Sequence, residues 1–494
     1  MRTPFTMNMS ALADRLRAED LLLAEIGADV ELTGIADDSR YVEDGDLFCA
    51  WSGTASDSHR FASDVVAAGV RALLVERELT GVRTPQLVVR NGRRAAAVAA
   101  SAFYGDPQRR LRLVGVTGTN GKTTTVWVLR HVLSQRAATA SLGTLGTILE
   151  DGSTLPGSEA LTTPGPVDLA RTLHVLAERG VRDVAMEVSS HALDQGRVQA
   201  LRFHAAAFMN LSRDHLDYHG TLEAYLIAKR SLIRLLRPDG CAIINADDQA
   251  WSGLAVEARR SLTFGVEAPA DVAAADIEYT AGGVGFELRT RQGGVRTRLP
   301  LPGAFNVQNA LAAAATCLAL GFSLTETAAA LESVPQVPGR LELIADEPCA
   351  VIRDYAHTPD ALERVLQALR PLTASRLIVV FGAGGDRDSG KRPFMGAVAE
   401  RLSDVAIVTS DNPRTEDADA IIDDIEAGMG LRRHVRITDR RSAIAHALEM
   451  AESRDIVLLA GKGHETYQII GDEKLPFDER TVVAELIAAR EVTP

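Results

Sequence analysis

Short runs of apolar residues alternate along the chain with longer stretches in which apolar residues recur at helical spacing. In the central region, the runs at 111–116, 183–188, 205–209 and 241–244 are mostly apolar, which is typical of strands buried on both faces of a parallel sheet. A chain of 494 residues is also long for a single hydrophobic core. The pattern therefore predicts an α/β protein with several domains.

The same alternation extends on both sides of this region. The N-terminal part has apolar runs at 46–50, 72–75 and 86–89 and a helical pattern at 93–104 that ends in a Tyr-Gly-Asp-Pro turn. Two prolines and a glycine in residues 334–340 mark a second boundary. Beyond it, predicted strands at 350–355, 376–381, 405–410 and 456–460 alternate with predicted helices at 359–369, 392–402, 419–427 and 441–452. We therefore predict a small α/β domain (1–110), a central parallel-sheet domain (111–338) and a Rossmann-like domain (339–494).

Polar residues follow most of these predicted strands directly. In the central domain such segments begin at Glu187, Asn210 and Asn245, and in the third domain they begin at Asp354, Gly382, Ser410 and Gly461. Ligands of open α/β sheets collect outside the carboxyl ends of the strands, so each sheet is predicted to have one binding edge. Each segment taken alone could equally be a helix cap.

One segment, VGVTGTNGKTTT at residues 114–125, has the arrangement of a phosphate-binding loop between a strand and a helix. Backbone N–H groups of such a loop surround phosphates, its lysine reaches the outer oxygens, and its hydroxyl residue can bind Mg²⁺. The positive end of the following helix adds to the attraction. The alternative is an ordinary glycine-rich turn. The loop residues are Gly118, Thr119, Asn120, Gly121, Lys122, Thr123 and Thr124.

Composition narrows the class of protein further. The formal net charge of −13 argues against a general nucleic-acid surface. No apolar run is long enough to cross a membrane, and the N-terminal residues lack the apolar core of a signal peptide. The four cysteines, Cys49, Cys241, Cys317 and Cys349, have no metal-like spacing and are expected to be buried thiols. We expect a cytoplasmic protein with no nucleic-acid partner and no membrane insertion.

The ordered set of motifs resembles the Mur ligase family over essentially the whole chain. Besides the phosphate loop, the motifs are EVSSHAL (187–193), NLSRDHLDYHGTLEAYLIAKR (210–230), DYAHTPDAL (354–362), GGDRDSGKRP (384–393), DNPRTED (411–417) and AGKGHE (460–465). They are most similar to members that add the third amino acid to UDP-N-acetylmuramoyl-L-alanyl-D-glutamate in peptidoglycan synthesis. The resemblance implies a monomeric, ATP-dependent amide ligase in which an acyl phosphate of D-glutamate is attacked by the incoming amine.

The resemblance also implies roles for the catalytic residues. Lys122 matches the lysine that contacts the ATP phosphates, and Thr123 and Glu187 match ligands of a first Mg²⁺. Lys229 matches a family lysine that is carbamylated, and the carbamate would help to bind a second Mg²⁺ together with His215. Without the resemblance, Lys229 would be read as an ordinary surface lysine on a helix.

Further positions match the family's contacts to the nucleotides and to the sugar peptide. Asn309, Arg340, Asp354 and His357 match contacts to adenosine, although His357 could equally be a capping histidine. Ser39 matches a contact to the UDP end, although the Asp-Asp-Ser-Arg segment could equally be a capped turn. Contacts to the muramoyl dipeptide are implied for Thr162, Thr163, Ser189, Gln195 and Arg197. The chain departs from the family at Ser58, where a glycine is common, so we assign no uracil contact nearby.

Selection of the amino acid is implied for Asp411, Asn412, Pro413 and Arg414, with Arg387, Gly461 and Glu465. A guanidinium binds a carboxylate as a planar fork, and a glutamate accepts from an amine. Because family members that use L-lysine typically lack this arginine, Arg414 indicates meso-diaminopimelate. The alternatives are L-lysine or another diamino acid, a folylpolyglutamate or D-alanyl-D-alanine-adding ligase, a regulatory P-loop NTPase, and an Asn-Pro turn with an incidental arginine.

Overall fold

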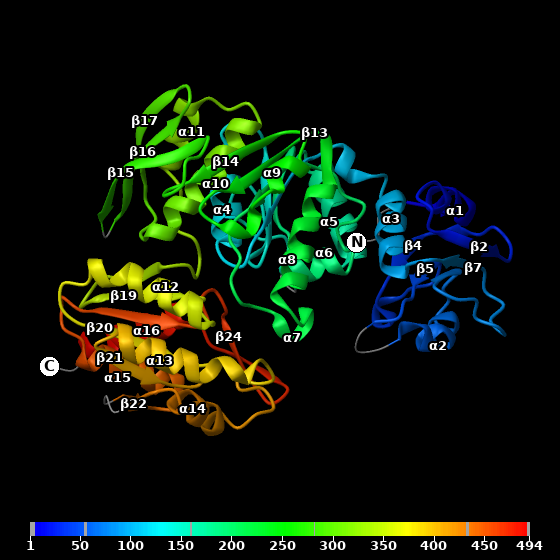
Figure 1. Cartoon of the computed structure of the whole chain (residues 1–494). Coiled ribbons are helices and arrows are strands. Elements are labelled where there is room, and N and C mark those ends of the chain that lie inside the picture. Colours follow the sequence, from blue (N-terminus) through cyan, green and yellow to red (C-terminus); the bar gives the residue numbers. More distant parts are fainter. Residues whose placement is uncertain (1–4, 54–56, 159–160, 281, 431–433, 492–494) are drawn as a thin grey trace. The chain divides into compact units, whose positions relative to one another are not determined.

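The computed structural model describes residues 5–53, 57–158, 161–280, 282–430 and 434–491 (Figure 1). The chain packs as two compact units. The first comprises Met1–Leu211, His219–Thr263 and Ala315–Phe322, and the second comprises Ser212–Tyr218, Phe264–Ala314 and Ser323–Pro494. Three larger sheets, each with its own hydrophobic cores, carry the mixed α/β fold.

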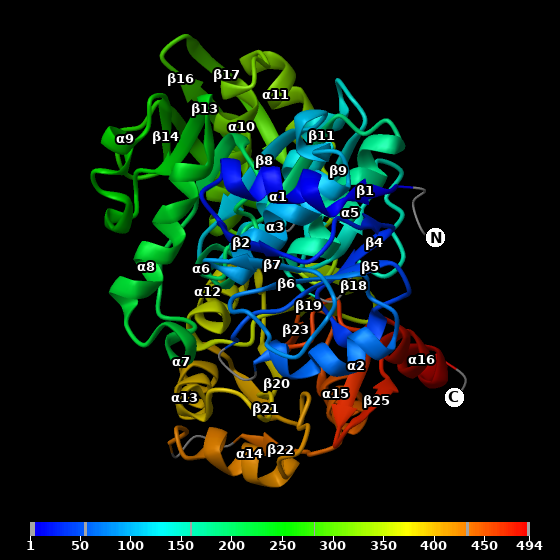
Figure 2. The same cartoon turned by 90° about the vertical axis from the view of Figure 1, so that its right-hand side faces the viewer.

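The N-terminal region is built around a five-stranded sheet. Its order is β2 (Leu22–Ile26), β7 (Gln86–Val89), β6 (Ala72–Val75), β5 (Asp46–Cys49) and β4 (Gly34–Ala36). Helices α1 (Met9–Ala18) and α3 (Gly92–Phe103) pack against each other (Figure 2), and α2 (Ala62–Ala67) covers the other side. Successive residues of β5 divide between the two cores: Leu47 packs with α1 and α3, and Phe48 packs with α2. The predicted strands and helix are confirmed.

The central sheet has ten strands. Their order is β10 (Gly146–Ile148), β9 (Thr139–Gly143), β11 (Asp183–Glu187), β8 (Arg112–Thr117), β12 (Phe203–Phe208), β13 (Leu236–Asn245), β14 (Ser261–Gly265), β15 (Val272–Thr280), β16 (Gly283–Thr290) and β17 (Gly293–Leu299). Strands β9, β11, β8, β12 and β13 are parallel, and the apolar runs predict all of them except β9. The sequence reading of continued strand–helix alternation is wrong for β15–β17, which pair antiparallel. Their residues alternate between buried and exposed, so one face of these strands meets solvent.

Helices connect and cover these strands. They are α4 (Lys122–Ser134), α5 (Pro166–Glu178), α6 (Ser190–Asp194), α7 (Leu216–His219), α8 (Leu222–Arg230), α9 (Leu254–Glu257), α10 (Ala304–Ala319) and α11 (Leu324–Leu331). Helix α4 packs on β9 and β11, while α5 places Leu169, Leu173 and Leu176 in a core with Val184 and Met186 of β11.

The C-terminal region has a six-stranded sheet. Its order is β18 (Glu342–Ala345), β19 (Ala350–Asp354), β23 (Ile456–Ala460), β20 (Leu377–Phe381), β21 (Val405–Val408) and β22 (Val435–Arg436). The helices are α12 (Pro359–Leu369), α13 (Arg392–Leu402), α14 (Ala418–Glu426), α15 (Arg440–Met450) and α16 (Glu479–Glu491), and a hairpin joins β24 (Tyr467–Ile470) to β25 (Glu473–Pro476). Val379 packs with α12–α14, and Val380 packs with α15 and α16, so helices cover both faces. This is the predicted Rossmann-like arrangement.

Burial of the cysteines agrees with a further expectation. All four cysteines are buried and none forms a disulfide. No helix within the described parts of the chain combines the length and the apolar character needed to cross a membrane.

Candidate functional site

The phosphate loop joins β8 to α4, and its two glycines are needed there for geometric reasons. Gly118 has a φ of 153°, and a Cβ on it would lie 2.7 Å from Met209 Cβ. Gly121 has a φ of 85° and directly precedes the first residue of α4, Lys122. Side chains at either position would strain or displace the backbone. The loop therefore leaves its backbone N–H groups and the N-terminus of α4 at the carboxyl end of β8.

Asn210, which follows β12, anchors this loop through its main chain and its side chain. The Asn210 carbonyl accepts from Thr119 N at 2.8 Å, and Asn210 Oδ1 accepts from Asn120 N at 2.8 Å. The Asn210 amide returns a hydrogen bond to the Asn120 carbonyl at 3.1 Å. Sequence reasoning assigned Asn210 no role, although a polar residue directly after a parallel strand is the signal that marks it.

Two lysines converge on the loop. Lys122 Nζ donates to the carbonyls of Gly118 and Thr119 at 2.9 and 2.8 Å. Lys229 Nζ, on α8, donates to the same Gly118 carbonyl at 2.7 Å and lies 4.4 Å from the centre of the Tyr225 ring. Because Lys229 is only 1% exposed, the alternative of an ordinary surface lysine is wrong. The fold therefore brings two ammonium groups to one carbonyl oxygen beside the phosphate loop.

A buried carboxylate ends the neighbouring strand. Glu187 is the last residue of β11, pairs in register with Val116 of β8, and is 1% exposed. Its Oε1 accepts from Thr144 N at 2.8 Å, and its Oε2 accepts from Thr144 Oγ1 at 3.3 Å. Thr123, in the first turn of α4, is also buried. A carboxylate and a hydroxyl are oxygen ligands of the kind that Mg²⁺ binds.

The residues predicted to bind the muramoyl dipeptide form one hydrogen-bonded network next to Glu187. Thr163 Oγ1 donates to the Glu187 carbonyl at 2.9 Å and accepts from Ser189 N at 3.1 Å. Arg197 donates to the Thr163 carbonyl at 2.8 Å and to Gln195 Oε1 through both Nε and Nη2. Thr162 joins the network through its hydroxyl, which lies 3.2 Å from that of Thr144. All five predicted residues are thus brought together.

Ser39 lies in a turn, and His215 directly precedes α7. Ser39 begins a 3₁₀ turn (Ser39–Tyr41) in which the Asp38 side chain accepts from Arg40 N, so the turn is capped. His215 adopts a φ of 53°, and its Nε2 lies 3.4 Å from Asp214 Oδ2. His215 belongs to the second compact unit, and its metal role stays a prediction.

Three of the four residues predicted to contact adenosine surround Tyr355. The Arg340 guanidinium lies 4.6 Å from the centre of the Tyr355 ring, and His357 Nδ1 lies 2.8 Å from the Tyr355 carbonyl oxygen. Asp354 accepts from Leu341 N at 2.7 Å, and burial raises the pKa of its carboxyl. Asn309 lies on α10, is buried, and donates to Asn306 Oδ1 at 2.9 Å.

In the C-terminal sheet, the segments after β21 and β23 are joined by side chains. Asn412 Nδ2 donates to Glu465 Oε2 at 2.9 Å. Lys462, which is fully buried, donates to Asn412 Oδ1 at 3.1 Å and lies 3.4 Å from Glu465 Oε2. Sequence reasoning missed Lys462 because a lysine within a glycine-rich segment gives no sign of burial.

Arg414 is held by its backbone and its side chain. It has a φ of 52°, its N donates to the Ile469 carbonyl of β24 at 3.1 Å, and its Nη1 donates to the Gly385 carbonyl at 2.7 Å. Gly461 packs so closely on Asp411 that a Cβ would lie 2.4 Å from Asp411 Oδ2. Asp411, Pro413, Arg414 and Gly461, which are all predicted to bind the amino acid, are therefore brought together. Arg387 is exposed and donates to the carbonyl of its neighbour Asp386.

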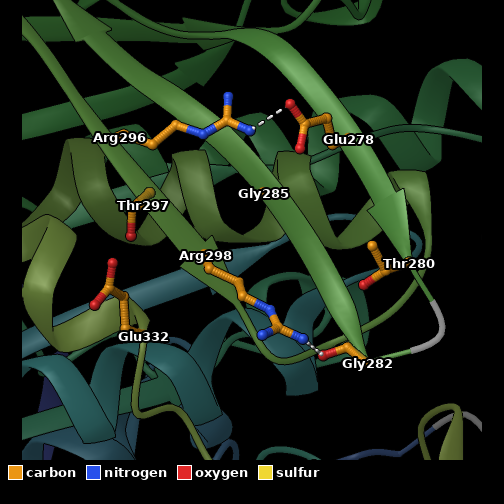
Figure 3. Close-up of a pocket in the computed structure, with 8 residues that line it drawn as sticks. All are labelled: Glu278, Thr280, Gly282, Gly285, Arg296, Thr297, Arg298 and Glu332. Atoms are coloured by element: carbon orange, nitrogen blue, oxygen red, sulfur yellow. Dashed lines mark hydrogen bonds and ion pairs between the residues drawn. The ribbon is translucent and has the colours of Figure 1, made fainter.

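Two further observations concern a cavity elsewhere in the fold and the residues that could hold a metal ion. A cavity of about 630 Å³ lies over β15–β17, where Arg296 pairs with Glu278 at 2.9 Å (Figure 3), and none of its lining residues is a predicted site residue. Among the residues that the structure describes, no group of three or more His, Cys, Asp or Glu side chains could hold a metal ion. A metal at Glu187 would therefore need hydroxyl, water or phosphate oxygens as additional ligands.

A glycine-rich loop between a parallel strand and a helix, with lysines and a buried carboxylate beside it, defines a P-loop nucleotide-binding α/β protein. Residues 116–317 match the Mur ligase middle domain, and residues 339–463 match the Mur ligase glutamate ligase domain. The chain belongs to the Mur ligase family.

Individual relatives match nearly the full length. The UDP-N-acetylmuramoyl-L-alanyl-D-glutamate–2,6-diaminopimelate ligase of Geobacillus kaustophilus is 45% identical over 474 residues, covering 94% of this chain and 96% of the relative. The ligase of the same name from Gloeobacter violaceus is 44% identical over 471 residues, covering 94% and 95%. A solved structure of a ligase of that name is 37% identical, with a TM-score of 0.66 and coverage of 94% and 96%. The predicted family membership is confirmed.

Proposed function

We propose that this chain is the ATP-dependent ligase that joins meso-diaminopimelate to UDP-N-acetylmuramoyl-L-alanyl-D-glutamate in peptidoglycan synthesis. The observation that carries the proposal is the near full-length likeness to relatives named for that reaction. We assign the UDP-sugar to residues 1–110, with Ser39 as a contact, the ATP phosphates to residues 111–338, and the amino acid to residues 339–494. The γ-phosphoryl group of ATP is transferred to the D-glutamate γ-carboxylate, the amine attacks the acyl carbon, and phosphate leaves.

The phosphate loop supplies the groups that bind ATP. We assign phosphate binding to the N–H groups at the N-terminus of α4 and to Lys122, which would exchange its bonds to the Gly118 and Thr119 carbonyls for phosphate oxygens. Thr123 and Glu187 would hold Mg²⁺, since both are buried oxygen donors next to the loop. Bound there, Mg²⁺ would neutralise charge on the phosphates. Asn309, Arg340, Asp354 and His357 are assigned to adenosine.

Lys229 is assigned to a carbamate because of where its amine lies. Its Nζ shares the Gly118 carbonyl with Lys122 and is buried beside the phosphate loop, where a metal-binding anion could act on the ATP phosphates. The deprotonated lysine amine can react with carbon dioxide to give a carbamate and a proton, so that an anion replaces the cation. That anion would attract Lys122 and could ligate a second Mg²⁺, the role that the family resemblance gives to Lys229.

The acceptor and the amine are bound by separate networks. We assign the muramoyl dipeptide to Thr162, Thr163, Ser189, Gln195 and Arg197, which are joined by hydrogen bonds beside Glu187. The amino acid is assigned to Asp411, Asn412, Pro413, Arg414, Arg387, Gly461 and Glu465. Only one guanidinium N–H of Arg414 is used by Gly385, so its planar fork can still bind the distal carboxylate of meso-diaminopimelate.

The test is a phosphate-release assay in which each substrate is omitted in turn. Release is expected only with ATP, the UDP-muramoyl dipeptide and meso-diaminopimelate together. Replacing meso-diaminopimelate with L-lysine should reduce kcat/KM strongly, because the distal carboxylate is lost. Phosphate release that is independent of the acceptor would contradict the proposal, and equal activity with L-lysine would contradict the assignment of the amino acid.

A further inference from the structure

The first residue of α15 has a fully buried guanidinium at the binding edge of the C-terminal sheet. Arg440 is 1% exposed and forms an ion pair with Glu479, the first residue of α16, whose side chain is also fully buried. Both Nε and Nη2 of Arg440 donate to Glu479 Oε1, at 2.9 and 2.7 Å. Helices α15 and α16 pack against each other on one face of the sheet (Figure 1).

The remaining donors of Arg440 bind two main-chain carbonyls. Nη2 donates to the Ala460 carbonyl at 2.9 Å, and Nη1 donates to the Ser410 carbonyl at 3.3 Å. Ala460 is the last residue of β23 and directly precedes Gly461. Ser410 follows β21 and directly precedes Asp411. One side chain therefore contacts the starting points of both segments that are assigned to the amino acid.

These two starting points are not linked by the sheet itself. Strand β20 lies between β23 and β21, so no ladder hydrogen bond joins the two strands directly. Ser410 N donates to the Thr438 carbonyl, two residues before Arg440, which fixes Ser410 relative to the start of α15. The bond from Arg440 to Ala460 then extends this connection across β20 to the second segment.

A buried ion pair is a poor stabiliser, because the cost of removing both charges from water offsets their attraction. Its geometry is nevertheless demanding, since a planar fork binds its partners only in fixed positions. Four hydrogen bonds on one guanidinium, two of them to the carbonyls of Ala460 and Ser410, therefore specify a distance between the two segments. Asn412 and Glu465, which belong to these two segments, are hydrogen-bonded at 2.9 Å.

We propose that Arg440 is a positioning residue for amino-acid selection, which sets the spacing of Arg414 and Glu465 through the Ser410 and Ala460 carbonyls. The inference rests on the proposed function, in which these two side chains bind the distal carboxylate and amine of meso-diaminopimelate. Arg440 itself is buried beneath the segments and touches no substrate. A shift of Ser410 relative to Ala460 would misplace the two recognising groups while leaving the phosphate loop unchanged.

The test is Arg440→Lys, which keeps the charge but cannot span both carbonyls and Glu479. We expect the KM for meso-diaminopimelate to rise about tenfold or more, with kcat and the KM for ATP changing less than about twofold. Preference for meso-diaminopimelate over L-lysine should fall. The matched control is Arg376→Lys, because Arg376 makes a similar fork to Asp455 and the Met450 carbonyl just before the start of β20, at the other edge of the sheet.

A second variant tests the same proposal if Arg440→Lys does not fold. Arg440→Gln combined with Glu479→Gln removes both buried charges together, and thermal unfolding checks that each variant is folded. An unchanged KM for meso-diaminopimelate in the folded variants, or equal changes in both KM values and kcat, would overturn the role of Arg440. If the wild-type protein ligates no diamino acid, the proposed function fails instead, and the inference fails with it.

Discussion

Asn210→Ala is expected to weaken ATP binding while leaving the other substrates unaffected. The change removes the hydrogen bond from Asn120 N to Oδ1 at 2.8 Å and the bond from Nδ2 to the Asn120 carbonyl at 3.1 Å. It keeps the main-chain bond from Thr119 N to the Asn210 carbonyl. The loop should therefore stay attached at Thr119 but lose its fixed conformation around Asn120.

The expected magnitude follows from these two bonds. Each contributes about 0.5–1.5 kcal/mol net, so about 1–3 kcal/mol of loop order is lost. If ATP binding must restore that order, affinity falls about 5- to 150-fold, since about 1.4 kcal/mol corresponds to a factor of ten. Asn210→Asp should be at least as harmful, because it keeps the acceptor for Asn120 N but turns a carboxylate oxygen toward the Asn120 carbonyl and the phosphates.

The assay combines the KM for ATP, from phosphate release, with the dissociation constant of ADP, from calorimetry. Asn91→Ala is the control, because Asn91 also bonds a main-chain N–H, that of Arg94 at 2.9 Å, but caps α3 in the N-terminal region. The reasoning is refuted if Asn210→Ala binds ADP as the wild type does, or if the KM for the muramoyl dipeptide rises as much as that for ATP.

Three other predictions concern separate parts of the chain. Lys229→Ala should abolish ligation and regain part of it with added short carboxylic acids, whereas full activity without additive would contradict the carbamate. Arg414→Lys should raise the KM for meso-diaminopimelate about tenfold or more and leave that for ATP unchanged, since the bidentate fork is lost; equal rises would place Arg414 elsewhere. Burial, then Asp168 and Asp38, raise the pKa of Asp37 to about 6. The stability contributed by this carboxyl is present below its unfolded pKa and is lost as pH rises through about 6, so Asp37→Asn should raise Tm at pH 8 but not at pH 4. A lower Tm for the variant at pH 8 would contradict that sign.

Local patterns account for the elements that the sequence predicts well. Continuous apolar runs identify β8, β11, β12, β20 and β23 because both faces of these strands are covered. The phosphate loop is also local, since its glycines, lysine and hydroxyls are consecutive. In contrast, β15–β17 have alternating burial and only short turns, and reading them as strand–helix alternation missed their antiparallel pairing.

Side-chain environments depend on contacts that no local pattern contains. Lys229 is buried by Tyr225 and by a carbonyl 111 residues away in sequence, so its own helix suggests only exposure. Lys462 contacts Asn412 across 50 residues, and Arg440 contacts Glu479 across 39. For such groups, the family resemblance identified Lys229 but gave no role to Lys462 or Arg440, because neither is assigned to a substrate.

The most direct test of the central claim is mass spectrometry of the ligation product. The protein is incubated with ATP, UDP-N-acetylmuramoyl-L-alanyl-D-glutamate and equal concentrations of meso-diaminopimelate and L-lysine. The account predicts one main product, whose mass is that of the UDP-muramoyl dipeptide plus meso-diaminopimelate less one water, with ADP formed in equal amount. A product that contains mainly L-lysine, or ADP formed without any ligated product, would contradict it.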